Sequence, residues 1–95
     1  MKLVWSSQSL QDLTAVHTFI SNNDPKAARE IVVRIVSLVE EKLPSNPYLG
    51  RPGRVAGTRE LVVPGTPFIV PYRVKRESIE IARVYHAARR WPSAL

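Results

Sequence analysis

The side chains near the end of the chain are the ones best suited to chemistry on a phosphate. His86 is followed by Arg89 and Arg90, and then by Trp91. A histidine beside arginines could supply a general acid and a clamp for phosphate charge, as RNA cleavage through a 2′-hydroxyl requires. The alternative is a histidine that ends a strand before a basic tail, with Trp91 packed against the body of the domain. The sequence favours this second interpretation.

Other catalytic and metal-binding patterns are missing from the sequence. The chain has no cysteine, and its two histidines, His17 and His86, do not form a metal-ligand spacing. The glycines of GRPGRVAG, residues 50–57, match neither phosphate-binding template and precede a strand rather than a helix. His17 flanks an apolar helix stripe and is interpreted as a surface residue. We therefore expect no metal and no cofactor.

The positive charge is concentrated in the second half of the chain. Residues 1–42 hold five bases and five acids, whereas residues 43–95 hold nine bases and three acids. An excess of this kind favours association with a polyanion or an acidic protein. The alternative is a solvated surface with ion pairs to Glu60, Glu77 or Glu80, but three acids cannot pair nine bases one to one.

Two amphipathic helices must position these groups. A short strand at residues 2–5 is followed by three serines able to cap a helix whose apolar residues recur every three or four positions up to residue 20. Asp24 and Pro25 begin a second helix that continues to Lys42. The short break at residues 21–25 joins the two as a helical hairpin.

The second half predicts an ordered loop and three strands. Residues 44–57 are rich in proline and glycine, and strands are expected at 58–63, 68–74 and 78–86. Pro71 cannot donate to a strand ladder, so its strand must be bulged or lie at an edge there. Strict alternation would place Arg83 and Tyr85 on the same face as Ile79.

The predicted fold is α+β, with the hairpin packed on one face of a small, mainly antiparallel four-stranded sheet. The other face is expected to stay partly open and to collect the bases. Residues 1–95 are expected to form one domain. No apolar window approaches the roughly 18 residues of a membrane span, and the apolar run at the start is too short for a signal peptide. A cytoplasmic location without membrane contact is the expectation.

The order of these elements resembles the RelE/ParE superfamily of bacterial type II toxins. The likeness spans nearly the whole chain and includes PYLGR at 47–51, GRVAGTRELVV at 53–63, FIVPYRV at 68–74, IEIARVYH at 79–86 and ARRWP at 88–92. The resemblance implies a helical hairpin on an antiparallel sheet. It also implies a cognate antitoxin that wraps the toxin and blocks it.

The superfamily divides into two activities. RelE-like members cut messenger RNA on the ribosome, and ParE-like members inhibit DNA gyrase. RelE-like nucleases usually carry an arginine three residues before the tyrosine that aligns here as Tyr72, where this chain has Ile69. An aliphatic side chain cannot stabilise phosphorane-like charge, so the resemblance favours a non-catalytic, ParE-like gyrase inhibitor.

Different residues are expected to act in the nuclease interpretation and in the binding interpretation. If the chain cleaves mRNA instead, the expected set is Arg59, Arg73, His86 and Arg89. The candidate residues for contact with target or antitoxin are Arg51, Arg54, Arg59, Tyr72, Arg73, Arg83, His86, Arg89, Arg90 and Trp91.

Overall fold

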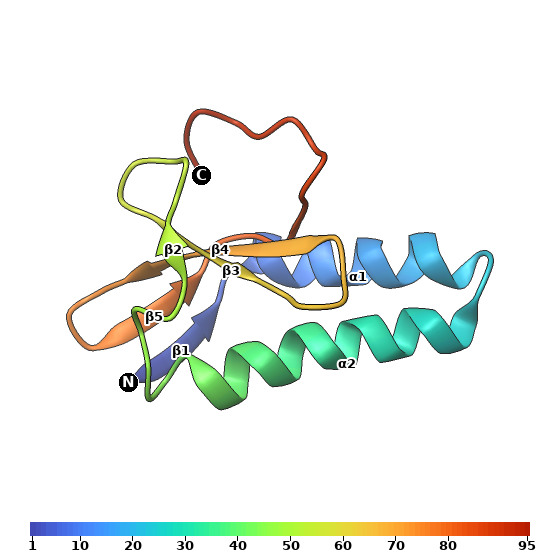
Figure 1. Ribbon diagram of the computed structural model, residues 1–95, viewed down its shortest axis with the longest axis horizontal. Coiled ribbons are helices and arrows are strands. Elements are labelled where there is room, and N and C mark those ends of the chain that lie inside the picture. The colour runs from blue at the N-terminus through green and yellow to red at the C-terminus, as the bar shows by residue number, and fades with distance from the viewer.

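Two layers make up the molecule, a helical hairpin and a twisted sheet (Figure 1). The computed structural model describes residues 1–95. Its α+β architecture confirms the predicted fold class, and no helix is long and apolar enough to span a membrane. The elements in chain order are β1 (Lys2–Trp5), α1 (Ser7–Ser21), α2 (Pro25–Lys42), β2 (Arg51–Pro52), β3 (Arg59–Val62), β4 (Phe68–Val74), β5 (Ser78–Ile81) and β6 (Tyr85–His86).

Side-chain caps begin both helices, as the sequence predicts. The Ser6 hydroxyl accepts a hydrogen bond from the Ser9 backbone N–H at 3.0 Å, and it donates to the Ala82 carbonyl at 2.8 Å. Asp24 Oδ1 accepts from the Ala27 N–H at 3.0 Å, with Pro25 at the first position of α2. Because Ser6 bonds in both directions, the start of α1 is tied to the end of β5.

Six strands form the sheet, rather than the four expected. The order is β1-β5-β4-β3-β2, with β6 paired to β4, and all neighbours are antiparallel except β1 and β5. The additional strands are the two-residue β2 and β6. The strand predicted at 78–86 is thereby divided into β5 and β6, which pair with opposite ends of β4.

A bulge opposite Pro71 causes this division. The Pro71 carbonyl accepts hydrogen bonds from both Ala82 N–H at 3.0 Å and Arg83 N–H at 3.4 Å, so two residues oppose one. The prediction that the strand of Pro71 is bulged or lies at an edge is wrong in its placement, because β4 is continuous and central and the extra residue lies in its partner. The strict alternation predicted beyond Ile81 is also wrong. Val84 joins the core, while Tyr85 lies against Trp91.

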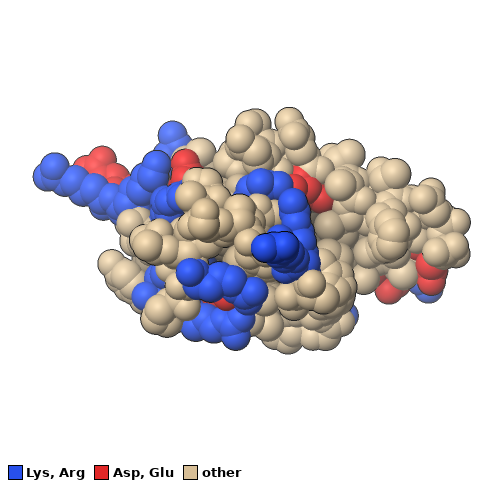
Figure 2. Space-filling model, turned by 90° about the horizontal axis from the view of Figure 1, so that it is seen from above, with Lys and Arg blue, Asp and Glu red and all other residues tan.

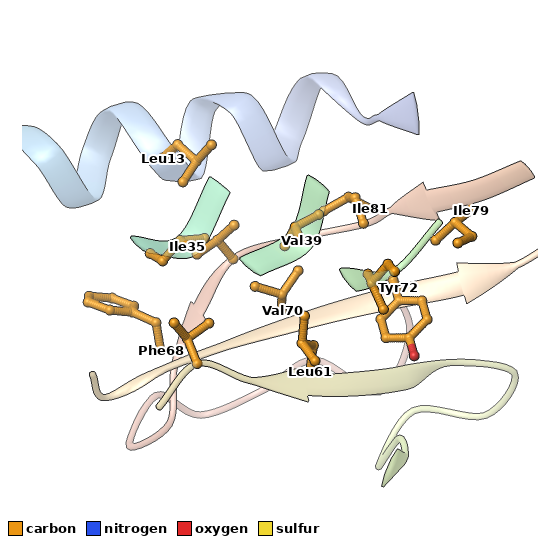
Figure 3. Close-up of a cluster of buried hydrophobic side chains, with 12 residues drawn as sticks. Leu13, Ile35, Val39, Leu61, Phe68, Val70, Tyr72, Ile79 and Ile81 are labelled. Carbon is orange, nitrogen blue, oxygen red and sulfur yellow. The ribbon is translucent and has the colours of Figure 1, made fainter. Parts of the chain in front are cut away.

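The main core lies between the helices and the sheet (Figure 3). Leu13 of α1 and Ile35 and Val39 of α2 point toward Val70 and Ile81 on the strands. These apolar contacts between the two layers supply the main stabilisation of a domain this small.

The sheet face away from α2 is more fully covered than the partly open face that the sequence predicts. Residues 87–95 arch over it (Figure 1). The Ala87 N–H donates to the Pro67 carbonyl at 2.8 Å, and Arg73 Nη2 donates to the Leu95 carbonyl at 3.1 Å. Beneath this segment, Ile69 is 5% exposed and Tyr85 is 1% exposed. The segment packs as part of the domain because this face is also apolar.

Candidate functional site

A buried carboxylate on β3 organises the segment that carries Arg51 and Arg54, which we call the basic loop. The Glu60 side chain is 2% exposed. Its Oε1 accepts from Arg51 Nη2 at 3.0 Å, and its Oε2 accepts from Arg54 Nε at 3.1 Å and from the Arg54 backbone N–H at 2.8 Å. Burial alone would raise the pKa of Glu60, but the hydrogen bonds from Arg54 and Arg51 outweigh it and hold the pKa below its ordinary value. Glu60 therefore stays ionised and fixes two arginines at the surface.

Arg54 connects this ion pair to the C-terminal segment. Its guanidinium Cζ lies 3.7 Å from the centre of the Trp91 ring, and Trp91 meets Tyr85 edge-on with centroids 5.0 Å apart. Arg83 and Arg89 lie 4.7 Å and 4.4 Å from the centre of the Tyr85 ring. We call these five residues the cation–aromatic cluster. As predicted, Trp91 packs the tail against the domain.

Asp12 of α1 fixes the bulge from the other side. Its carboxylate accepts from Arg83 Nε at 2.8 Å and Nη2 at 3.0 Å, and also from the Val84 backbone N–H at 2.9 Å. The hydrogen bonds to Asp12 raise the pKa of Arg83. Sequence reasoning missed Asp12, because the partners lie 71 residues apart and no local pattern connects them.

Two of the predicted contact residues, Tyr72 and Arg59, make hydrogen bonds to the PYLGR loop. Tyr72 is fully buried, and its hydroxyl accepts from the Gly50 N–H at 2.9 Å and donates to the Pro47 carbonyl at 2.7 Å. Arg59 Nε donates to the Gly50 carbonyl at 2.8 Å and Nη2 donates to the Tyr48 carbonyl at 3.3 Å. These bonds hold the loop against the sheet, and Tyr72 has no surface to offer a partner.

The proposed nuclease set does not converge on one point. His86 pairs with Phe68 at the start of β4, while Arg73 lies five residues farther along the same strand. At about 3.3 Å per residue their backbones are roughly 17 Å apart. Arg73 bonds to Glu80 at 3.3 Å, and Arg59 is engaged with the PYLGR loop. Of the set, only His86 and Arg89 line a common groove.

That groove lies between the hairpin and the start of β4, and we call it the hairpin groove. Its volume is about 590 Å³. Phe19, which is 77% exposed, lies on its wall, and Arg89 contributes a basic side chain. His86 also lines the groove, and its Nδ1 accepts a hydrogen bond from the Ala88 N–H at 3.0 Å. Its apolar lining residues are Ala15, Val16, Phe19, Ile20, Ile31, Phe68 and Val84. Sequence periodicity assigned most of these residues to the core, so the groove was not predicted.

The surface charge follows the sequence pattern. On the face seen in Figure 2, lysine and arginine side chains gather over the sheet half, whereas the end with the turn between α1 and α2 is mainly uncharged. Arg51, Arg54 and Arg90 belong to the exposed bases, and Arg90 makes no ion pair. No group of three or more histidine, cysteine, aspartate or glutamate residues is placed to hold a metal ion.

Known proteins share both this sequence and this fold. Residues 3–91 match the family described as ParE toxin of type II toxin-antitoxin system, parDE. The chain is 40% identical to Putative toxin Y4kP of Sinorhizobium fredii over 94 residues, covering 99% of this chain and 96% of that protein. It is 35% identical to Toxin RelE2 of Caulobacter vibrioides over 88 residues, covering 93% and 97%.

A solved structure confirms the arrangement in space. The structure described as Chromosomal ParDE TA system from P. aeruginosa superposes with a TM-score of 0.80 at 34% identity, covering 90% of this chain and 95% of that one. YafQ from E. coli has the same fold at a TM-score of 0.54 and 18% identity, covering 92% and 93%.

Proposed function

This chain belongs to the ParE toxin family of type II toxin–antitoxin systems, and from that premise we propose that it inhibits DNA gyrase and is silenced at the hairpin groove. A type II toxin has a cognate antitoxin as its partner. The observation that carries the gyrase assignment is the likeness to the ParDE structure at 34% identity. The dispersal of Arg59, Arg73 and His86 supports it, because no bond-breaking centre is assembled.

The hairpin groove suits an amphipathic helix of the antitoxin. Its apolar wall would take the apolar face of such a helix, and Arg89 at the rim would attract acidic residues. Association should therefore be steered by charge and should slow as salt is raised. Exposed Phe19 is the residue on this wall with most surface to lose on binding.

The gyrase-facing surface in this proposal is the basic face over the sheet. Arg51 and Arg54 are held outward by Glu60, with side chains 54% and 42% exposed. Arg90 and Trp91 extend the same surface along the C-terminal segment. A preformed array of this kind binds an acidic or nucleic-acid-associated protein surface without ordering its own side chains first.

Purified toxin free of antitoxin tests the gyrase assignment directly. It should block supercoiling by gyrase or accumulate cleaved DNA, and Arg90→Ala should weaken the effect. Arg29→Ala is the matched control, because Arg29 is an exposed arginine on α2. Unchanged gyrase activity at several-fold molar excess of toxin contradicts the proposal.

Ribosome-dependent cleavage of mRNA is the second candidate. Two observations favour it, the 35% identity to a protein named Toxin RelE2 and the position of His86 and Arg89 on one groove. Primer extension on a translated message would then show codon-linked cuts that disappear in His86→Ala. Intact messages under conditions where cell growth is arrested would exclude this activity.

A further inference from the structure

The PYLGR loop presents an aromatic side chain to solvent. Tyr48 is 67% exposed, and Arg59 lies beside it with its Cζ 5.4 Å from the centre of the Tyr48 ring. A single exposed apolar side chain is ordinary on a protein surface. Tyr48 differs from such a residue because side chains of the sheet fix the backbone on both sides of it.

The loop backbone is held before, at and after Tyr48. The Pro47 carbonyl accepts from the Tyr72 hydroxyl at 2.7 Å, and the Tyr48 carbonyl accepts from Arg59 Nη2 at 3.3 Å. The N–H of Gly50 donates to Tyr72 and its C=O accepts from Arg59. The Tyr48 side chain makes none of these hydrogen bonds. The loop therefore supports the ring without depending on it.

Three positions on or beside the sheet are committed to this support. Tyr72 is fully buried, and both hydrogen bonds of its hydroxyl go to the loop. Arg59 makes no ion pair, and both hydrogen bonds of its guanidinium go to loop carbonyls. Gly50 is needed where the loop meets the sheet, because a Cβ would lie 2.7 Å from the Glu60 carbonyl oxygen and from the Tyr72 ring. Together they make a rigid loop that exposes an aromatic ring.

A rigid tyrosine beside an arginine has the properties of a binding anchor. Tyrosine and arginine are enriched among the residues that dominate the binding energy of protein interfaces. A tyrosine ring has only two side-chain torsions to order, and the backbone below Tyr48 is already fixed in the free toxin. Burial of Tyr48 by a partner would therefore cost little conformational entropy.

The charge around Tyr48 indicates an acidic partner. Residues 42–59 include four bases and no acid, and the neighbouring Glu60 is buried. The Arg51 side chain is 54% exposed, and its backbone lies three residues from Tyr48, at most about 11 Å along the chain. One protein surface could thus contact Tyr48 together with Arg51, which belongs to the proposed gyrase-facing surface.

The loop lies away from the hairpin groove. Arg59, which supports the loop, pairs with Tyr72. Tyr72 follows Phe68 of the groove lining by four residues along β4, which is roughly 13 Å at about 3.3 Å per residue. Substitutions at the loop and at the groove can therefore separate binding of one partner from binding of the other.

We propose that Tyr48, with Arg59 beside it, anchors the toxin on gyrase by entering an apolar pocket with an acidic rim. This inference rests on the proposed function, which names gyrase as the target, and it adds a recognition contact to the basic face. The ring supplies the apolar contact, and the surrounding bases steer the toxin toward acidic groups.

Tyr48→Ala and Tyr48→Phe form a matched pair of variants for the test. Alanine removes the ring, whereas phenylalanine keeps the ring and removes only the hydroxyl. Both should melt at the wild-type temperature, because the loop is held through the Tyr48 carbonyl and not through its side chain. The toxin concentration that half-inhibits supercoiling should rise at least about tenfold in Tyr48→Ala and less than about threefold in Tyr48→Phe.

Val33→Ala is the control for loss of exposed apolar surface in general. Val33 is 56% exposed on α2, away from the loop, so this variant should inhibit gyrase as the wild type does. Inhibition by Tyr48→Ala at the wild-type concentration overturns the inference. An equal loss of inhibition in Tyr48→Ala and Tyr48→Phe also overturns it, because the hydroxyl and not the ring would then make the contact.

Two further binding measurements exclude other partners for the ring. Affinity for the protein encoded beside the toxin gene should differ by less than about threefold between wild type and Tyr48→Ala, and a tenfold loss would assign the loop to the antitoxin instead. A short single-stranded oligonucleotide tests for stacking on DNA. Binding of the oligonucleotide by the wild-type toxin that disappears in Tyr48→Ala overturns a protein contact.

The wild-type assay separates this inference from the proposed function. If the wild-type toxin inhibits gyrase and Tyr48→Ala inhibits it equally, the anchor assignment alone fails and gyrase remains the target. If the wild-type toxin does not inhibit gyrase, the proposed function fails and takes the anchor assignment with it.

Discussion

Replacing Glu60 with glutamine should release the basic loop and destabilise the fold. The carboxylate of Glu60 is buried and accepts from the side chains of Arg51 and Arg54 and from the Arg54 backbone. Glutamine has nearly the same shape, but it carries no charge and offers one acceptor oxygen in place of two. Its amide N–H₂ would face arginine donors, so several of these hydrogen bonds cannot form.

The stability lost in Glu60→Gln depends on whether Arg51 and Arg54 can be hydrated once the carboxylate is gone. Removing one member of a buried ion pair costs about 3–5 kcal/mol when the remaining charge stays buried. Here the remaining charges can be hydrated, because the side chains of Arg51 and Arg54 are 54% and 42% exposed. We therefore expect a decrease of about 2 kcal/mol in the free energy of unfolding, close to the value of one charge-assisted hydrogen bond.

Urea denaturation of wild type and Glu60→Gln at neutral pH measures this loss. With a slope of about 1 kcal/mol per molar urea for a small domain, the midpoint should fall by about 2 M. Trp91 reports the local effect, because Arg54 lies on its ring. In a Trp5→Phe background, Trp91 fluorescence should shift in Glu60→Gln before global unfolding begins.

The same pair of proteins has a defined pH dependence. The pKa of Glu60 is lowered on folding from 4.5, so the unfolded state binds the proton more readily. The stabilisation by Glu60 is therefore complete above about pH 5 and is lost as pH falls below 4.5 through the folded-state pKa. The difference between wild type and Glu60→Gln should shrink over that window. Equal midpoints at neutral pH, or a difference that grows on acidification, would refute the reasoning.

Three further substitutions test other parts of the structure. Gly50→Ala should lower the free energy of unfolding by roughly 2 kcal/mol in thermal melts, because a Cβ would lie 2.7 Å from both the Glu60 carbonyl oxygen and the Tyr72 ring. Asp12→Asn should cost about 2 kcal/mol by urea denaturation, since the Arg83 ion pair is lost and one acceptor oxygen becomes a donor. Phe19→Ser should weaken antitoxin binding about tenfold in calorimetry with little change in melting temperature, because Phe19 is 77% exposed in the free toxin.

The helices and their order could be predicted because their determinants are local. Asp24 and Pro25 specify the start of α2 within four residues of sequence, and the apolar stripe gives its direction. The hairpin then needs only a short turn. Pro71 gave a partial prediction, because its missing N–H indicates an irregular ladder but does not say whether the strand is bulged, lies at an edge or faces a bulge in its partner.

The sequence could not predict which residues after the bulge face the core, because this depends on how many residues the partner strand inserts opposite Pro71. Both Ala82 and Arg83 donate to the Pro71 carbonyl, and this extra residue moves Val84 into the main core and places Tyr85 on the opposite face of the sheet, against Trp91. Tyr85 then becomes the platform on which Trp91 rests. The position of the C-terminal segment therefore depends on the bulge at Ala82 and Arg83, which the local sequence pattern does not reveal.

Counting charges also misjudged which bases are free. One-to-one pairing left six of nine bases without acids, yet Glu60 binds both Arg51 and Arg54, and Glu80 binds both Arg73 and Lys75. Asp12, from the half that looked balanced, binds Arg83. The bases of the second half without an acidic partner are Arg59, Arg76, Arg89 and Arg90.

Where these free bases lie matters more for binding than how many there are. Arg59 is engaged by loop carbonyls, and Arg76 lies alone in the turn between β4 and β5. Arg89 and Arg90 are adjacent, exposed and attached to a segment that Trp91 anchors. An anchored pair of unpaired cations loses little conformational freedom on contact with an acidic surface. We therefore propose that the end of the chain, more than the sheet as a whole, makes the first contact with an acidic partner.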